Sequence, residues 1–232
     1  MKVAIMQPYL FPYIGYFQLV NAVDKFIFYD DVSFIKGGWI NRNVIQIQGE
    51  RKYINLTLIG ASSFKNINEI NINGGQEKIL KTIKQNYCKS PYFKQAFSLI
   101  EEVLIKSKDI KLISEIASLS VMLISSYLGI DTKFEYSSKL YNNTINLNRT
   151  DRLIEICKIN KADEYFNPIG GMELYDKFNF KEKEILLKFI KTNNVEYKQF
   201  NDIFLSNLSI IDVIMFNNPE TIKEFLTNYT ID

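Results

Sequence analysis

The sequence of 232 residues contains no histidine. Catalytic triads and acid–base schemes that use imidazole are therefore excluded, and zinc or haem centres lose their commonest ligand. The two cysteines, Cys88 and Cys157, stand in no CxxC pair, which argues against a metal or redox motif. Any chemistry must use carboxylates, lysine, arginine, tyrosine, serine, amides or a bound cation.

Long apolar runs and a strong charge bias are also missing. No run reaches the roughly 18–20 residues that span a bilayer, and Gln7, Pro8 and Pro12 interrupt the apolar start, so no signal peptide is indicated. The formal net charge of +2 does not favour nucleic acid as an obligate partner. We expect a soluble, cytoplasmic protein with no membrane span and no DNA partner.

The residues that are present predict an α/β protein. The hydrophobic content of 47% is enough for the core of a single domain over residues 1–232. Strands are predicted at 2–6, 25–29, 132–136, 164–167 and 184–190, a β-hairpin at 44–48 and 51–58, and helices at 16–23, 76–87, 92–106, 109–128, 149–160, 209–216 and 219–229. Because helices and strands alternate, we expect a mostly parallel, Rossmann-like sheet flanked by helices, with residues 76–128 as a candidate helical insertion or subdomain.

The segment QPYLFPYIGY, residues 7–16, follows the first predicted strand. Two prolines stiffen it, a glycine allows close backbone approach, and a helix N-terminus after it can bind an anion. The alternative is a strand-to-helix turn whose aromatic rings pack on the core. The candidate ligand-binding residues here are Gln7, Pro8, Tyr9, Pro12, Gly15 and Tyr16.

The segment DDVSFIKGGWINRN, residues 30–43, follows the second predicted strand. Adjacent carboxylates can act as a base or hold Mg²⁺, cationic side chains suit phosphate, and the single tryptophan can stack on a base or sugar. The alternative is a solvated loop that caps the sheet. The candidate catalytic residues are Asp30, Asp31 and Lys36, and the candidate binding residues are Trp39, Asn41, Arg42 and Asn43. We expect segments 7–16 and 30–43 to line one cleft, because ligands bind at the carboxyl ends of parallel strands.

Three later positions carry weaker signals. Ser137 follows a predicted strand, and Gly170–Gly171 follow another, so both can approach a phosphate or sugar; turns and caps are the alternative. Thr150 is a candidate N-cap, and the run Ser209–Asp212 is close to a capping box.

Taken together, residues 2–43 resemble the opening of the WbqC-like family: an apolar strand, QPYLFPYIGYF, an apolar helix, DKFIFYDDVSF, and a tryptophan followed by NRN. Similar later pieces include RLIEIC at 152–157 and LSIID at 208–212. The resemblance implies a place among surface-polysaccharide genes, especially O-antigen clusters with modified amino sugars. Many members have Ser-Gly where this chain has Pro168–Ile169, so no serine role carries over there.

A second likeness, at the level of fold, is to nucleotidylyl transferases and pantothenate-synthetase-like ligases. These enzymes have an HxGH signature where this chain has PYIGY, and both histidines are absent here. The likeness implies only a nucleotide or acyl-adenylate pocket.

Three functions remain open from the sequence. The first is amide formation on a nucleotide-linked amino sugar, with a dTDP-sugar favoured and the acyl or aminoacyl donor undetermined. The second is nucleotidyl or adenylyl transfer, for which ATP and Mg²⁺ would be the cofactors. The third is a non-catalytic sugar-nucleotide-binding protein of the same pathway. Oligomer formation is left open.

Overall fold

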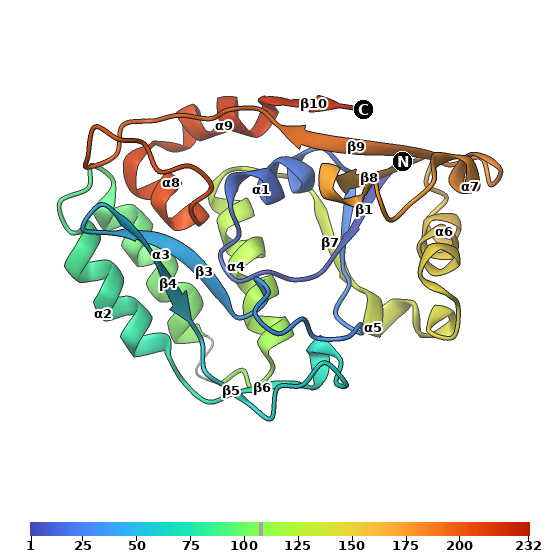
Figure 1. The fold of residues 1–232 in the computed structure, drawn as a ribbon, viewed down its shortest axis with the longest axis horizontal. Coiled ribbons are helices and arrows are strands. Elements are labelled where there is room, and N and C mark those ends of the chain that lie inside the picture. Colours follow the sequence, from blue (N-terminus) through green and yellow to red (C-terminus); the bar gives the residue numbers. More distant parts are fainter. Residues whose placement is uncertain (107–108) are drawn as a thin grey trace.

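The computed structural model describes residues 1–106 and 109–232 and is built on a six-stranded sheet with the order β10-β9-β8-β1-β2-β7 (Figure 1). Neighbouring strands are parallel except for β10, which runs antiparallel to β9. The strands are β1 Lys2–Met6, β2 Lys25–Phe28, β7 Lys133–Tyr136, β8 Glu164–Pro168, β9 Leu186–Thr192 and β10 Tyr229–Ile231. The predicted α/β class with a mostly parallel sheet is confirmed.

The strand order reverses beside β1. From β1 the chain adds β2 and β7 on one side, and later adds β8 and β9 on the other. In open α/β sheets a crevice forms at such a switch point, beyond the carboxyl ends of the strands, because the connecting segments diverge there. The topology therefore directs attention to the residues that follow β1 and β8.

Both faces of the sheet are buried, as a parallel sheet requires. Alternate residues of β1 enter different clusters: Val3 and Ile5 pack with Leu153 of α6, whereas Ala4 packs in the cluster that contains Phe17 of α1. One face is covered by α1 Ile14–Asn21, α4 Ile113–Tyr127 and α9 Pro219–Thr227, and the other by α6 Arg149–Ile159 and α7 Lys177–Lys181. The helix α8 Ile210–Phe216 packs farther out, on α9, on the strand of residues 42–47 and on the helix of residues 93–106.

A long segment between β2 and β7 adds a hairpin and helices. Its elements are β3 Arg42–Ile47, β4 Glu50–Asn55, β5 Leu58–Ile59, β6 Asn71–Ile72, α2 Gln76–Tyr87, α3 Phe93–Lys106 and α4. The predicted hairpin is confirmed, and Gln48 and Gly49 at its tip both have positive φ, which suits the twist of the two strands. In Figure 1, α2, α3 and the hairpin lie on the opposite side of the molecule from α6 and α7.

Two local predictions are wrong. Asn148, not Thr150, is the N-cap of α6, because its side chain accepts the backbone N–H of Asp151. Ser209 does cap α8, but Asp212 does not complete a capping box; its carboxylate binds Tyr87 and Tyr197 instead. In the described part of the chain, no helix combines the length and apolar character needed to cross a membrane.

Candidate functional site

A cavity of about 770 Å³ opens at the switch point of the sheet; we name it the switch-point cavity. It is bounded by Met6 at the end of β1 and Gln7 directly after it, by Asp31 after β2, and by Asn167 and Pro168 at the end of β8. The candidate residues that the structure brings together here are Gln7, Tyr9, Asp31, Gly170 and Gly171. They come from three strand ends, as the topology leads one to expect.

Asp31 is held in this cavity by a buried ion pair. The Arg152 Nη2 of α6 lies 2.6 Å from Asp31 Oδ2, and both side chains are only 4% exposed. Ser137 Oγ donates to Asp31 Oδ1, Arg152 Nε donates to Thr144 Oγ1, and the Arg152 guanidinium lies 4.8 Å from the ring centre of Tyr29. The carboxylate is therefore fixed in orientation, with its charge compensated.

Asp30 has a different role from its neighbour. Its carboxylate accepts the backbone N–H of Ser138 at 3.0 Å and the Ser138 hydroxyl at 2.7 Å, at the start of α5 Ser137–Leu140. Asp30 and Ser137 are buried and lie outside the cavity lining. Because the Asp30 carboxylate is turned toward Ser138 and lies outside the cavity lining, only Asp31 of the pair could face a Mg²⁺ ion in the cavity, which does not fit a site built on both carboxylates.

Arg149 is a cavity residue that the sequence analysis missed. It is exposed, opens α6 and lines the switch-point cavity, and no ion-pair partner is found for it in residues 1–106 and 109–232. Burial raises the pKa of Tyr175 on the same wall, and the Arg149 guanidinium opposes that rise. The charged groups on the described lining are Asp31, Arg149 and Arg152, so the cavity carries a net charge of +1 and suits an anion. The sequence does contain a signal for Arg149: a positive charge in the first turn of a helix is unfavourable beside the positive end of the helix dipole, so an arginine at this position indicates a role other than helix stability.

The two glycines after β8 are not equivalent. A Cβ on Gly171 would overlap with Asn167 Oδ1, whereas a Cβ on Gly170 would meet nothing within 4 Å. Asn167 is buried, and its Nδ2 donates to Tyr165 Oη at 2.7 Å. Gly171 is therefore required for the close turn that presents Asn167 to the cavity, and Gly170 leaves open space beside it.

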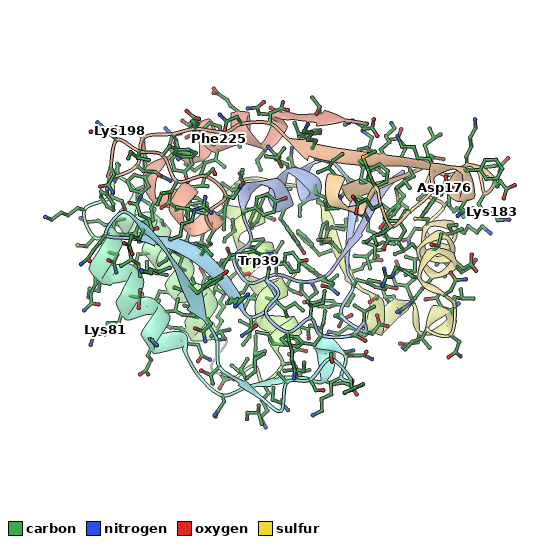
Figure 2. The ribbon with its side chains drawn as sticks, viewed as in Figure 1. Trp39, Lys81, Asp176, Lys183, Lys198 and Phe225 are labelled. Atoms are coloured by element: carbon green, nitrogen blue, oxygen red, sulfur yellow. The ribbon has the colours of Figure 1, made fainter. Side chains whose placement is uncertain are left out.

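A second cavity, of about 420 Å³, adjoins the first; we name it the aromatic cavity. Its lining is Met6, Tyr9, Pro12, Tyr13, Tyr16, Trp39, Asn43, Pro168 and Asn207. Met6, Tyr9 and Pro168 line both cavities. Trp39 is 41% exposed and lies near the middle of the face drawn in Figure 2, away from the peripheral Lys81 and Lys183. The two candidate segments thus contribute to two cavities with a common wall.

The loop between β1 and α1 is fixed by hydrogen bonds from distant elements. Leu10 N donates to Trp39 O, and the Asn43 amide donates to Leu10 O. Phe11, which is fully buried and has a φ of 43°, donates its N–H to Ser120 Oγ and accepts from Ser209 Oγ at 2.6 Å. These contacts hold the aromatic wall rigid, so the candidate Asn43 positions this loop as well as lining the cavity.

The remaining candidates lie elsewhere. Arg42 donates to the carbonyls of Gly37 and Gly38 and packs 4.4 Å from the ring centre of Tyr53, which braces the turn before β3. Asn41 donates to Leu56 O at 2.9 Å. The structure does not bring Lys36, Asn41, Arg42, Pro8 or Gly15 into the lining of either cavity. Gly15 is buried where a Cβ would overlap with Tyr13 and Thr192, so it serves close packing.

Comparison with known proteins gives a family but no reaction. The WbqC-like protein family model matches residues 7–224. Rv1507c, an uncharacterized protein of Mycobacterium tuberculosis (strain ATCC 25618 / H37Rv), is 28% identical over 229 residues, which cover 97% of this chain and 97% of that protein. No solved structure shows a significant match. Since the matched residues make up far more than half of the chain, from the loop after β1 to α9, the chain belongs to the WbqC-like protein family.

Proposed function

We propose that the protein forms an amide on a nucleotide-linked amino sugar, most suitably a dTDP-sugar. The observation that carries this proposal is the pair of adjoining cavities: one is lined by aromatic rings, and the other holds a guanidinium without an ion-pair partner in the described chain. A nucleotide-linked sugar has the same division into a flat base and an anionic diphosphate with a sugar attached.

The base fits the aromatic cavity, where Trp39 and Tyr9 offer ring faces for stacking. The diphosphate then crosses the wall that Tyr9 shares between the cavities and reaches Arg149, which can bind phosphate oxygens bidentately. The sugar lies deeper in the switch-point cavity, between Gln7 and Asp31. At about 770 Å³, this cavity is within the range of roughly 300–1,000 Å³ that is usual for small-molecule sites.

The chemistry needs an activated acyl donor, such as a thioester or an acyl adenylate. The neutral sugar amine attacks the acyl carbonyl, the C–N bond forms, and the bond to the sulfur or to AMP breaks. The proton that the amine loses is taken up by the released thiolate or, when AMP leaves, by solvent. Asp31, fixed by Arg152, can accept the hydrogen bond of the attacking amine and so aim its lone pair. No hydrogen bond in the described structure occupies the Gln7 side-chain amide, which can therefore donate to the developing oxyanion.

The decisive experiment titrates the protein with a dTDP-linked amino sugar by calorimetry. Arg149→Ala should lower the affinity at least about tenfold, because hydrogen bonds to charged groups contribute about 1.5–3 kcal/mol, and Trp39→Ala should also lower it. Arg51→Ala is the matched control, since Arg51 is an arginine that lies off both cavities. Unchanged affinity in both Arg149→Ala and Trp39→Ala would refute the binding mode.

Turnover is then read by product mass. The protein is incubated with the dTDP-amino sugar and, in separate arms, with an acyl thioester, an acyl adenylate and an aminoacyl donor. A product heavier by one acyl group identifies the donor class. Tight sugar-nucleotide binding without product in any arm would favour the non-catalytic binding protein over the transferase.

A further inference from the structure

The mouth of the switch-point cavity carries a group of exposed aliphatic side chains. Ile35, Ile145, Leu147 and Leu174 all line this cavity and are 53%, 47%, 42% and 56% exposed, respectively. They come from three separate segments: the loop after β2, the turn before α6 and the turn after Gly171. Three parts of the chain therefore place an apolar group at one opening.

The backbone that carries two of these side chains is fixed by hydrogen bonds. Leu147 N donates to Thr144 O at 3.1 Å, and Leu174 N donates to Gly171 O at 2.9 Å, so both leucines sit in hydrogen-bonded turns. Single exposed aliphatic residues are ordinary on a protein surface, but a convergent group beside a cavity marks a binding surface. The nucleotide-linked sugar proposed above is polar and leaves this apolar mouth unused.

The same cavity contains the partner for a charged end. Arg149 lines it and opens α6, two residues after Leu147. In the absence of the sugar nucleotide, a ligand with an aliphatic chain and an anionic group can therefore occupy the mouth and Arg149 together, and an alkyl phosphate serves as such a probe below.

We propose that this mouth binds an aliphatic acyl chain, and that the acyl donor of the reaction is an aliphatic acyl thioester. The role of the chain as donor rests on the proposed function, whereas its binding can be measured by itself. An aliphatic chain at the mouth would bring the carbonyl inward, toward Gln7 and Asp31, which lie on the same cavity.

The test uses the full chain and a series of alkyl phosphates with one, four, six and eight carbons, titrated by calorimetry. Complete burial of a methylene raises affinity about fourfold, so a half-open mouth should give about two- to fourfold per methylene. Arg149→Ala should lower the affinity for every member by a similar factor. An affinity that does not change with chain length would overturn the proposal.

A double variant and a control variant test whether the aliphatic chain binds at this mouth. The double variant Leu147→Ser with Leu174→Ser should flatten the dependence on chain length without changing the melting temperature, because both residues are exposed. Leu140→Ser is the matched control, since Leu140 is 58% exposed on α5 and lies off both cavities. A chain-length dependence that survives the double variant would place the aliphatic site elsewhere and refute the assignment.

A competition experiment separates the two natural sources of such a chain, an acyl donor and a lipid carrier. Octanoyl-CoA should displace bound octyl phosphate, whereas displacement by farnesyl phosphate alone would overturn the assignment to an acyl donor. The dTDP-sugar titration depends on Trp39 and is carried out separately. Its failure with the chain-length dependence intact would refute the proposed function but not the aliphatic site.

Discussion

Asp31 and Asp212 are both buried carboxylates, but their partners differ in kind. Asp31 lies on a cavity and is paired with Arg152. Asp212 is fully buried away from both cavities and accepts hydrogen bonds from neutral groups: Tyr87 on Oδ2 at 2.7 Å, and Tyr197 and Gln199 on Oδ1 at 2.7 and 2.9 Å. No cationic partner for Asp212 is found in the part of the chain that the structure describes.

The two carboxylates therefore differ in role: Asp31 belongs to the candidate site, and Asp212 stabilises the elements that support the site. The Asp212 contacts join α2, the segment after β9 and α8, and the start of α8 in turn fixes the proline loop, since Ile210 N donates to Pro12 O. A carboxylate that only ties elements together can be enclosed by neutral donors. The carboxylate at the cavity is held by a cation, which keeps it oriented while one side faces the cavity.

The largest expected effect is at the ion pair. Arg152→Ala should lower the free energy of unfolding by about 3–5 kcal/mol, because it leaves Asp31 buried without compensation. Urea denaturation at pH 7 measures this. Arg149→Ala, in the same helix but exposed, should stay within about 0.5 kcal/mol. Adding Asp31→Asn to Arg152→Ala should restore part of the loss; a further loss would show that charge compensation is not the cause.

A smaller effect is expected at the neutral cluster. Tyr87→Phe should cost about 2–3 kcal/mol, because Oδ2 of Asp212 loses its donor and Gln46 N loses its acceptor. Tyr197→Phe should cost about 1 kcal/mol, since Gln199 still donates to Oδ1. The two variants are compared by urea denaturation under the same conditions. Equal losses would mean that the cluster relaxes around Asp212 and is less rigid than its geometry indicates.

The glycine pair tests whether the cavity wall is as closely packed as the Asp212 cluster. Gly171→Ala should cost about 1–2 kcal/mol, because its Cβ forces Asn167 away from Tyr165. Gly170→Ala has open space and should remain within about 0.5 kcal/mol. Thermal unfolding gives both values. If the two variants unfold alike, the turn adjusts freely and Asn167 is not fixed by Gly171.

The smallest effect is expected on the pH dependence of the free energy of unfolding. Burial raises the pKa of Asp212, and the hydrogen bonds from Tyr197, Tyr87 and Gln199 only partly oppose this. Because the pKa of Asp212 is higher in the folded protein than in the unfolded protein, protonation of Asp212 stabilises the fold. This stabilisation is fully present below the pKa of the unfolded state and is lost as the pH rises through the pKa of the folded state. The wild type should therefore lose stability relative to Asp212→Asn as pH increases from about 4. Parallel curves of unfolding free energy between pH 4 and 8 would contradict this.

Much of the fold was predictable from local patterns. The apolar runs of β1 and β2 and Gly49 in the hairpin turn are local signals, and they led to the correct elements, although the turn lies at Gln48–Gly49 and not at the predicted Gly49–Glu50. The strand β10 was missed because its three residues gain order only by pairing with β9. Asp212 was interpreted as part of a cap because its true partners, Tyr87 and Tyr197, are distant in sequence or follow no local motif.

The sequence by itself determined the five parallel strands of the sheet, the loop that follows β1 and the exclusion of imidazole chemistry, because these depend on residue type and short-range spacing. Only the tertiary structure decided which polar groups meet. It paired Asp31 with Arg152 across 121 residues, turned Asp30 toward Ser138, and placed Arg149 rather than Arg42 at the cavity. Such contacts form when elements that are distant in the sequence pack on the sheet. Sequence spacing does not encode them, because strand order and helix placement set the distances between these side chains.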